Sequence, residues 1–307
     1  MRRYRQQAIY EHLRLRADIL QAIRTFFRDH QYLEVETPVR IPAPAPEAHI
    51  DPQESGRWFL HTSPELCMKM LLSAGFPRIF QICRCFRKNE RGRKHLPEFS
   101  LLEWYTAGHD YLEMMAQCEA LLPYISASIG KTDSIVRKGR VISLSPPWEK
   151  LTVAAAFDQY SRISMQEALR RNRFDEIMGL DIEPHLGMER PVFLYDYPAS
   201  CGALARLKPE DATVAERFEL YIAGIELCNA FTELTDPVEQ RSRFEQERLY
   251  RQQTGKTVYP LPENFLKALT DMPAASGNAM GIDRIVMLLT ETEAIDDVVA
   301  FTPEELG

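Results

Sequence analysis

Residues 78–106 carry the sequence RIFQICRCFRKNERGRKHLPEFSLLEWYT, the most informative stretch of the chain. Apolar and polar side chains alternate over 78–87 and again over 97–106, and a polar loop of nine residues separates the two runs. A period of two is typical of half-buried β-strands. The stretch therefore predicts an antiparallel β-hairpin.

The faces of this hairpin can be assigned because side chains of equal parity point to the same side of a strand. On the outgoing strand Arg87 shares its side with Cys83 and Cys85. If the two strands face the same way, one surface carries Arg87, Phe99, Glu103 and Tyr105. These groups suit a ligand with a phosphate, a flat base and a cationic amine. A simple cross-strand ion pair on a surface hairpin explains the arginine and the glutamate equally well.

Outside the hairpin the chain predicts further strands interleaved with helices. Helices are expected where apolar residues recur at helical spacing: 4–30, a stretch beginning near Pro64, 110–128, 237–253, 263–270 and the segment after 281, with weaker periodicity near 163–179 in a mixed region from 129 to 190. Strands are expected at 32–37, 57–62, 191–197, 203–207 and 214–234. Regular β-α-β alternation is absent, so we expect the α+β class, with an antiparallel sheet flanked by helices.

The bulk composition is that of an ordinary soluble globular protein. Of 307 residues, 45% are hydrophobic and 26% charged, and the net charge of −7 argues against a large nucleic-acid footprint. No stretch approaches the roughly 18 apolar residues of a membrane helix. The first residues lead into an amphipathic helix instead of an apolar signal segment. We therefore expect a cytoplasmic protein that does not bind a membrane.

Cysteine and histidine spacing predicts neither a disulfide framework nor a zinc site. The six cysteines contain no C-x-x-C pair, and the seven histidines show no H-E-x-x-H or comparable spacing. Cys83 and Cys85 lie in an apolar run, where cysteine usually packs as a small hydrophobic residue. A P-loop and a Rossmann fingerprint are also missing, so any nucleotide must be held in another way.

The run from Arg87 to Phe99 resembles motif 2 of the class II aminoacyl-tRNA synthetases. In that motif an arginine grips the α-phosphate of ATP and a phenylalanine stacks on adenine, and Arg87 and Phe99 match these positions. The resemblance also places His95 against the outer phosphates and Leu96 in the nucleotide site. Asn89 stands where the family has a glutamate, so a hydrogen-bond acceptor is kept but its charge is lost.

Two further stretches resemble motifs 1 and 3 of the same family, in the family's order. Residues 27–38, FRDHQYLEVETP, are similar to motif 1, whose helix, strand and proline build the dimer interface, so a homodimer is implied. Residues 275–289, ASGNAMGIDRIVMLL, are similar to motif 3, whose arginine covers the adenine. Arg284 matches that arginine and Gly281 would let the backbone approach a ligand. The resemblance thus gives Arg87 and Arg284 catalytic roles.

The continuation PEFSLLEWY, 97–105, is similar to the lysyl branch of the family, where the glutamate and tyrosine of the return strand line the amino-acid pocket. Glu103 and Tyr105 match them. Residues 62–65, TSPE, predict a capping box with proline in the first helical turn. In the lysyl enzymes the same tetrapeptide binds the substrate amino group, which implies contacts from Ser63, Pro64 and Glu65.

Residues 224–233, GIELCNAFTE, resemble the segment whose two glutamates hold Mg²⁺ against ATP. Glu226 and Glu233 match them, the second also meeting the lysine side chain, and Leu227 falls in the nucleotide site. The two glutamates are seven residues apart, so a regular strand would point them to opposite faces. A bulge or bend near Asn229 and Ala230 is therefore required.

Two departures from lysyl-tRNA synthetases point to one branch. Only about 25 residues precede motif 1, where those enzymes carry an anticodon-binding domain, so we expect residues 1–307 to form a single catalytic domain without one. The glycine-rich entry to motif 3 has Ala279, whose methyl group shrinks the amino-acid site and is worth about 1–3 kcal/mol of discrimination. Both features are similar to the elongation factor P–lysine ligase family, which transfers a lysyl group, preferably (R)-β-lysine, to a lysine of elongation factor P.

The resemblance implies ATP-dependent activation of lysine or β-lysine with Mg²⁺, and transfer of the aminoacyl group to elongation factor P. The basic residues of the motif 2 loop would meet that acidic, tRNA-like protein: Arg91, Arg93 and Lys94. We do not expect tRNA as the acceptor. Three alternatives stay open: tRNA aminoacylation through the acceptor stem alone, a small-molecule amino-acid ligase, and a non-catalytic synthetase paralogue, which Asn89 allows.

Overall fold

Nine strands form the main sheet of the computed structural model, which describes residues 4–137 and 139–307. Within these residues the strands follow the order β1-β5-β6-β14-β13-β12-β10-β9, with β11 attached to β12. Neighbours are antiparallel except β1 with β5 and β9 with β10. Their bounds are β1 Leu33–Glu34, β5 Arg78–Phe86, β6 Glu98–Ala107, β9 Glu149–Thr152, β10 Val192–Pro198, β11 Leu207–Lys208, β12 Asp211–Ile222, β13 Ile225–Thr232 and β14 Ala275–Gly281. The expected α+β class with a mainly antiparallel sheet is confirmed.

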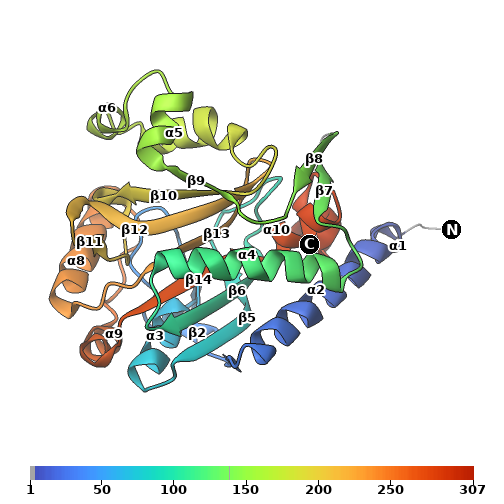
Figure 1. Ribbon diagram of the computed structural model, residues 1–307. Coiled ribbons are helices and arrows are strands. Elements are labelled where there is room, and N and C mark those ends of the chain that lie inside the picture. The colour runs from blue at the N-terminus through green and yellow to red at the C-terminus, as the bar shows by residue number, and fades with distance from the viewer. Residues whose placement is uncertain (1–3, 138) are drawn as a thin grey trace.

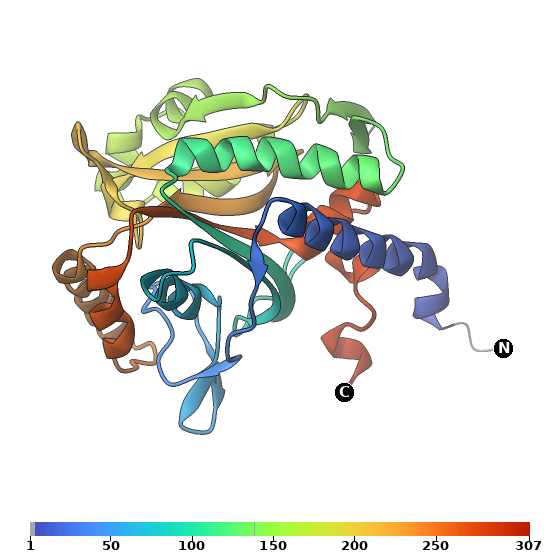
Figure 2. The same ribbon diagram turned by 60° about the horizontal axis from the view of Figure 1, so that its bottom comes forward.

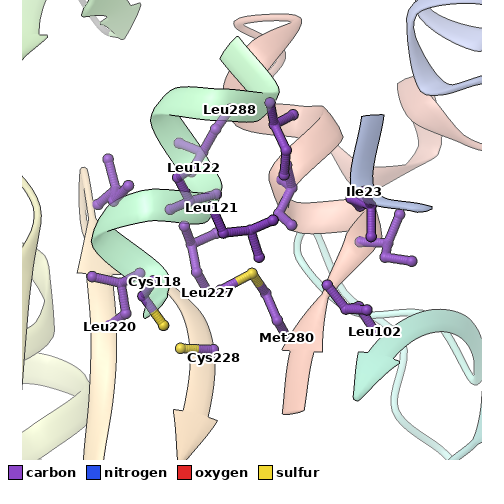
Figure 3. Packing of buried hydrophobic residues seen from close by; sticks show 14 of the residues in the cluster. Ile23, Leu102, Cys118, Leu121, Leu122, Leu220, Leu227, Cys228, Met280 and Leu288 are labelled. Carbon is purple, nitrogen blue, oxygen red and sulfur yellow. The ribbon is translucent and has the colours of Figure 1, made fainter. Parts of the chain in front are cut away.

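One face of this sheet is covered by three helices, which are α2 Tyr10–Asp29, α4 Tyr111–Ser128 and α10 Ile282–Leu289 (Figure 1). Figure 2 shows α2 and α4 running side by side. Beneath them lies the largest apolar cluster, in which Leu121 and Leu122 of α4 meet Leu227 and Met280 of the sheet (Figure 3). Asp110 begins α4 with a full capping box, because its carboxylate accepts from the amide of Glu113, whose side chain accepts from Asp110 N–H.

The opposite face of the sheet is covered only in part. Helices α3 Glu65–Ser73, α8 Pro237–Gln253 and α9 Glu263–Ala268 form a second apolar cluster with Ile79 and Tyr105 at one end of this face. Nearer the middle, Phe99, Asn229 and Ala279 remain partly exposed. The sheet therefore offers a floor on which a ligand can lie.

The remaining elements lie around the ends of the sheet. They are α1 Arg5–Ala8, the small sheet of β2 Arg40–Ile41, β3 Gln53–Ser55 and β4 Trp58–Leu60, the hairpin of β7 Ser134–Arg137 and β8 Arg140–Ser143, and the helices α5 Val153–Tyr160, α6 Met165–Arg170 and α7 Phe174–Ile177. A third apolar cluster joins α5, α6 and α7 to β10. Within the described ranges, every helix is too short or too polar to span a bilayer.

Most of the expected elements are present with shifted ends. The hairpin over 78–106 is confirmed, and the expected helix over 4–30 is α1 and α2 with a short break at Ile9. The strand expected at 203–207 is wrong, because only Leu207–Lys208 is extended. The long strand expected at 214–234 is two strands, since Ala223 and Gly224 both have positive φ angles and form a tight two-residue turn.

Candidate active site

The open face of the sheet collects side chains from three adjacent central strands. The strand register pairs Glu103 of β6 with Ala279 of β14, and Ala279 with Asn229 of β13. The next paired row is Tyr105, Gly277 and Phe231. Directly paired residues point to the same face of a sheet, so the predicted surface of Phe99, Glu103 and Tyr105 extends across β14 to β13.

A β-bulge in β13 brings Glu226 to the same face as Glu233, which directly follows the strand. The register with β12 shifts between the pairs Leu220–Cys228 and Tyr221–Glu226, which leaves Leu227 as the extra residue. The expected bulge is therefore present, but its predicted place near Asn229 and Ala230 is wrong. The Leu227 side chain packs in the apolar core, so only its main chain can face a nucleotide.

Glu103 lies in a buried group of acids at one end of the face. Its carboxylate accepts hydrogen bonds from Ser63 Oγ at 2.8 Å and from Tyr105 OH at 2.6 Å. Burial, followed by the negative charge of Glu65, raises the pKa of Glu103 well above its ordinary value. An ammonium group placed here would restore the ionised form.

Lys69 links the two other acids of this pocket. Its buried ammonium group forms ion pairs with Glu65 and, at 2.5 Å, with Glu233. Burial raises the pKa of Glu233 to about 8 even though Lys69 opposes that shift. Three carboxylates thus share the pocket with one internal cation, so the pocket is deficient in positive charge and suits a cationic amine.

The residues before α3 place Glu65 in the pocket in an unexpected way. The predicted capping box from Thr62 to Glu65 is wrong, because Ser63 Oγ, and not Thr62, accepts from the Glu65 amide at 2.9 Å. The Glu65 carboxylate is therefore free to bind Lys69. Pro64 is the residue that precedes the helix and carries no ligand-directed polar atom. Lys69 follows Glu65 by four residues, a helical ion-pair spacing that was visible in the sequence, but its partner Glu233 was not.

Two arginines lie at the other end of the face. The Arg87 guanidinium stacks over the Phe99 ring, 5.0 Å from its centroid, and Arg87 Nε is buried without a hydrogen-bond partner among the described residues. Arg284 donates to the Glu226 main-chain oxygen at 2.7 Å, to its carboxylate at 3.1 Å and to His95 Nε2 at 2.7 Å. The structure therefore brings the predicted phosphate- and adenine-binding residues together.

These charges shift the pKa values of two neighbouring side chains, His95 and Glu226. Packing in the pocket, followed by the positive charge of Arg284, lowers the pKa of His95 to about 4, although more than a third of the residue is exposed. Burial alone would raise the pKa of Glu226, but Arg284 and then Arg87 lower it below the ordinary value. A neutral His95 and an ionised Glu226 follow, so Arg87 and Arg284 supply the positive charge that phosphates require at this end of the face.

Asn89 lies outside the group. It is exposed in a turn with a φ of 66°, a conformation that asparagine tolerates better than most residues. The neighbouring Glu90 instead approaches Arg87, at 3.8 Å. A carboxylate therefore lies near Arg87, one residue after the position where the family has its glutamate.

The loop between β5 and β6 is tied to distant parts of the chain. Arg91 forms ion pairs with Glu304 at 2.8 Å and Asp296 at 2.9 Å, and the main chain of Arg93 accepts from the Ile295 amide. Lys94 donates to the Gly224 carbonyl, and Leu96 is buried in the core. Arg91, expected as a contact for an acidic partner, is already engaged by the chain's own acids.

Two glycines on β14 differ in what they permit. A Cβ atom at Gly277 would lie 2.3 Å from the Tyr105 ring and 2.4 Å from Glu233 Oε1, so only glycine lets these side chains rest on the strand. At Gly281 the nearest atom to a Cβ would be Arg284 Cδ at 3.5 Å, an ordinary contact. Between them, the methyl group of Ala279 lies on the open face beside Glu103.

Oxygen donors of the kind that Mg²⁺ prefers lie along β13 and just beyond its end. Glu226 and Asn229 lie on β13 and Glu233 directly follows it, and the buried Asn229 Oδ1 and Glu233 Oε1 have no hydrogen-bond partner within the described ranges. Carboxylate and amide oxygens are the ligands that Mg²⁺ prefers. Sequence reasoning found the two glutamates and missed Asn229, although its place three residues after Glu226 was visible.

Comparisons with known proteins agree with this arrangement. A family model for class II tRNA synthetases (D, K and N) matches residues 1–305. The elongation factor P–(R)-β-lysine ligases of Salmonella typhi, Salmonella dublin and Salmonella paratyphi B are each 41% identical to this chain over 303 residues, covering 94% of this chain and 93% of theirs. The chain therefore belongs to the class II tRNA synthetases of the D, K and N group, and within that group to the family of elongation factor P–(R)-β-lysine ligases.

Proposed function

We propose that this protein activates a lysine-type amino acid with ATP and transfers it to a lysine of elongation factor P. The observation that carries the proposal is one sheet face with opposite charge at its two ends: buried acids around Glu103 and Glu233, and guanidinium groups at Arg87 and Arg284. The relatives named for (R)-β-lysine support the same amino acid here. A diamine and a nucleotide would lie end to end on this face.

The first step joins the amino acid to AMP. The substrate carboxylate attacks the α-phosphorus of ATP and pyrophosphate leaves, and no general base is needed because the carboxylate is already ionised at neutral pH. Arg87 neutralises the α-phosphate, Phe99 stacks on adenine, and His95 and Arg284 bind the outer phosphates. Mg²⁺ held against ATP by the carboxylates of Glu226 and Glu233 would supply further neutralisation of phosphate charge.

The acid pocket holds the amines of the substrate. Glu103 accepts from Ser63, and Glu65 and Glu233 both pair with Lys69, so each ammonium group of the substrate can meet a carboxylate. Ala279 narrows the pocket beside Glu103. A shift of the amino group from the α to the β carbon changes where that group meets Glu65, which gives the pocket a means to distinguish the two lysine isomers.

The second step transfers the aminoacyl group to the acceptor. The uncharged amine of an acceptor lysine attacks the carbonyl carbon of the mixed anhydride, AMP leaves, and the amine loses a proton as the amide forms. Arg87 stabilises the departing AMP phosphate. We propose that residues 1–307 carry out both steps as one catalytic domain, and that the acceptor is a protein instead of tRNA.

We also propose that the protein is a homodimer and works in the cytoplasm. The expected motif 1 segment, 27–38, contains β1 at the edge of the main sheet, where Leu33 is 51% exposed and Phe76 39% exposed. Apolar side chains at a sheet edge are typical of a subunit interface. All six cysteines are free, which fits a reducing compartment.

The test is ATP–pyrophosphate exchange with α-lysine, (R)-β-lysine and a panel of other amino acids, followed by mass analysis of elongation factor P. We expect exchange with lysine isomers and a mass increase of one lysyl group on elongation factor P. Charging of bulk tRNA under the same conditions would favour the tRNA-aminoacylating alternative. Pyrophosphate exchange with no modification of either elongation factor P or tRNA would favour a small-molecule ligase. Complete absence of exchange would favour a non-catalytic paralogue.

A further inference from the structure

Three potential metal ligands that are not part of the proposed mechanism meet on the open face of β5. They are His61, Cys83 and Cys85, and one ligand atom from each lies within 4.8 Å of the other two. The two sulfur atoms are 3.8 Å apart because residues two apart on a strand point the same way. His61 and Cys85 are buried, whereas Cys83 is half-buried and provides access from the solvent.

The main chain fixes the position of His61 beside these sulfurs. The His61 amide donates to Val39 and its carbonyl accepts from the Phe86 amide at 3.0 Å, at the end of β5. The ring Nε2 lies 2.7 Å from the Arg84 carbonyl oxygen. A carbonyl oxygen only accepts, so Nε2 carries the proton and Nδ1 keeps a free lone pair. Histidines that bind metals commonly donate their second nitrogen to a carbonyl in this way.

The sulfur separation matches a tetrahedral metal site and not a disulfide. Two thiolates bound to Zn²⁺ at about 2.3 Å with tetrahedral angles are about 3.8 Å apart. The distance between Cys83 Sγ and Cys85 Sγ is 3.8 Å. A disulfide would require a separation of about 2.0 Å. The two sulfur atoms are thus spaced to coordinate one metal ion.

The chemistry of the donors selects the kind of ion. Two sulfurs and one imidazole favour thiophilic cations such as Zn²⁺ and disfavour Mg²⁺, which prefers oxygen. We propose that His61, Cys83 and Cys85 form a three-ligand site for a thiophilic divalent cation, with its fourth position open toward the substrate face.

The site lies between the two halves of the proposed catalytic face. Cys83 pairs in register with Leu101 and Cys85 with Phe99, while Glu103 lies one row further on. An ion held there would occupy space between the amine pocket and Arg87, and its open position could take the substrate carboxylate. We therefore expect Zn²⁺ to inhibit amino-acid activation. This inhibition rests on the proposed function, whereas the binding of the metal is independent of it.

The binding test uses the full-length, metal-free protein in a phosphine reductant, without ATP or amino acid, titrated with Cd²⁺. Cadmium bound to thiolates absorbs in the ultraviolet by charge transfer, whereas cadmium on carboxylates such as Glu226 does not. We expect this absorption to saturate at one ion per chain. Cys83→Ser and Cys85→Ser should lose it, and His61→Ala should bind at least about tenfold more weakly, as expected when one ligand is removed.

Cys201→Ser is the matched control, because Cys201 is another half-buried cysteine but lies outside the group. It should bind Cd²⁺ as the wild type does. The proposal is overturned if the wild type shows no saturable absorption, or if Cys83→Ser and Cys85→Ser retain it. Circular dichroism and thermal melting of the metal-free variants establish folding, and Cys83→Ser decides the matter if the buried Cys85→Ser does not fold.

The functional arm uses the same variants in pyrophosphate exchange. One equivalent of Zn²⁺ should inhibit the wild type and Cys201→Ser, and Cys83→Ser should resist it. If Zn²⁺ inhibits exchange equally in the wild type, Cys201→Ser and Cys83→Ser, inhibition through this site is refuted. The Cd²⁺-binding result is not affected by that outcome. An inactive protein that still binds Cd²⁺ through its cysteines would refute the proposed function and not the metal site.

Discussion

At the scale of single residues, the acid pocket depends on a glycine. Gly277→Ala places a methyl group against the Tyr105 ring and Glu233, at distances that real structures do not tolerate. We expect a loss of about 1–3 kcal/mol in the free energy of unfolding, as for other overpacked sites, together with a raised KM for lysine. Urea unfolding and pyrophosphate exchange measure the two effects. Gly281→Ala is the control and should be as stable as the wild type; equal stability and KM in both variants would contradict the argument.

Lys69 is the second residue on which the pocket depends, because it is the internal cation between Glu65 and Glu233. Lys69→Met keeps the length of the side chain but leaves buried carboxylates unpaired, which we expect to cost about 3–5 kcal/mol of stability. Adding Glu233→Gln removes one of the unpaired charges and should recover part of the loss. Chemical denaturation of the single and double variants provides the measurement, and a Lys69→Met protein as stable as the wild type would refute the role of the ion pairs.

Glu103 should make stability depend on pH. Its pKa is raised in the folded protein, so over the range between the unfolded and folded values the folded chain holds a proton that the unfolded chain has released. The contribution of Glu103 to the free energy of unfolding is fully present below pH 4.5. It falls as the pH rises toward the pKa of Glu103 in the folded protein, by at most about 1.4 kcal/mol per pH unit for one proton. Unfolding experiments at pH 5.5 and 8 should show a smaller decline in Glu103→Gln than in the wild type. Parallel pH profiles would exclude Glu103 as the source.

At the scale of secondary-structure elements, the loop between β5 and β6 carries His95 and is fastened by Arg91 to Asp296 and Glu304. These pairs are partly exposed, so Arg91→Ala should change stability by less than about 1 kcal/mol. It should nevertheless raise the KM for ATP, because His95 is then less firmly placed for the outer phosphates. Hydrogen exchange over 88–96 should increase in parallel. Arg93→Ala keeps the main-chain hydrogen bond to Ile295 and is the control. If it raises the KM for ATP as much as Arg91→Ala does, the ion pairs of Arg91 are not the cause.

The same elements explain how far the sequence alone could lead. The β5–β6 hairpin was predictable because two runs of strand-like residues flank a polar loop, and the two-residue period of a strand then predicts which side chains share a face. β14 was missed, since Gly277, Ala279 and Gly281 carry almost no strand propensity and owe their conformation to the larger side chains packed on them. The triad of His61, Cys83 and Cys85 was missed because its histidine joins the cysteines through tertiary structure, 22 residues from the nearer one.

At the scale of the whole molecule, the proposed homodimer can be tested at the edge of the main sheet. β1 pairs on one side with β5 and ends the sheet, and Leu33 in it is 51% exposed beside Phe76. Leu33→Glu would place a charge in a buried interface and should convert the dimer to a monomer in sedimentation velocity at micromolar concentration. Val141→Glu on β8, which is 67% exposed and belongs to the separate β7–β8 hairpin, is the control and should stay dimeric. A monomeric wild type would refute the homodimer. A dimer that Val141→Glu disrupts and Leu33→Glu does not would place the interface away from β1.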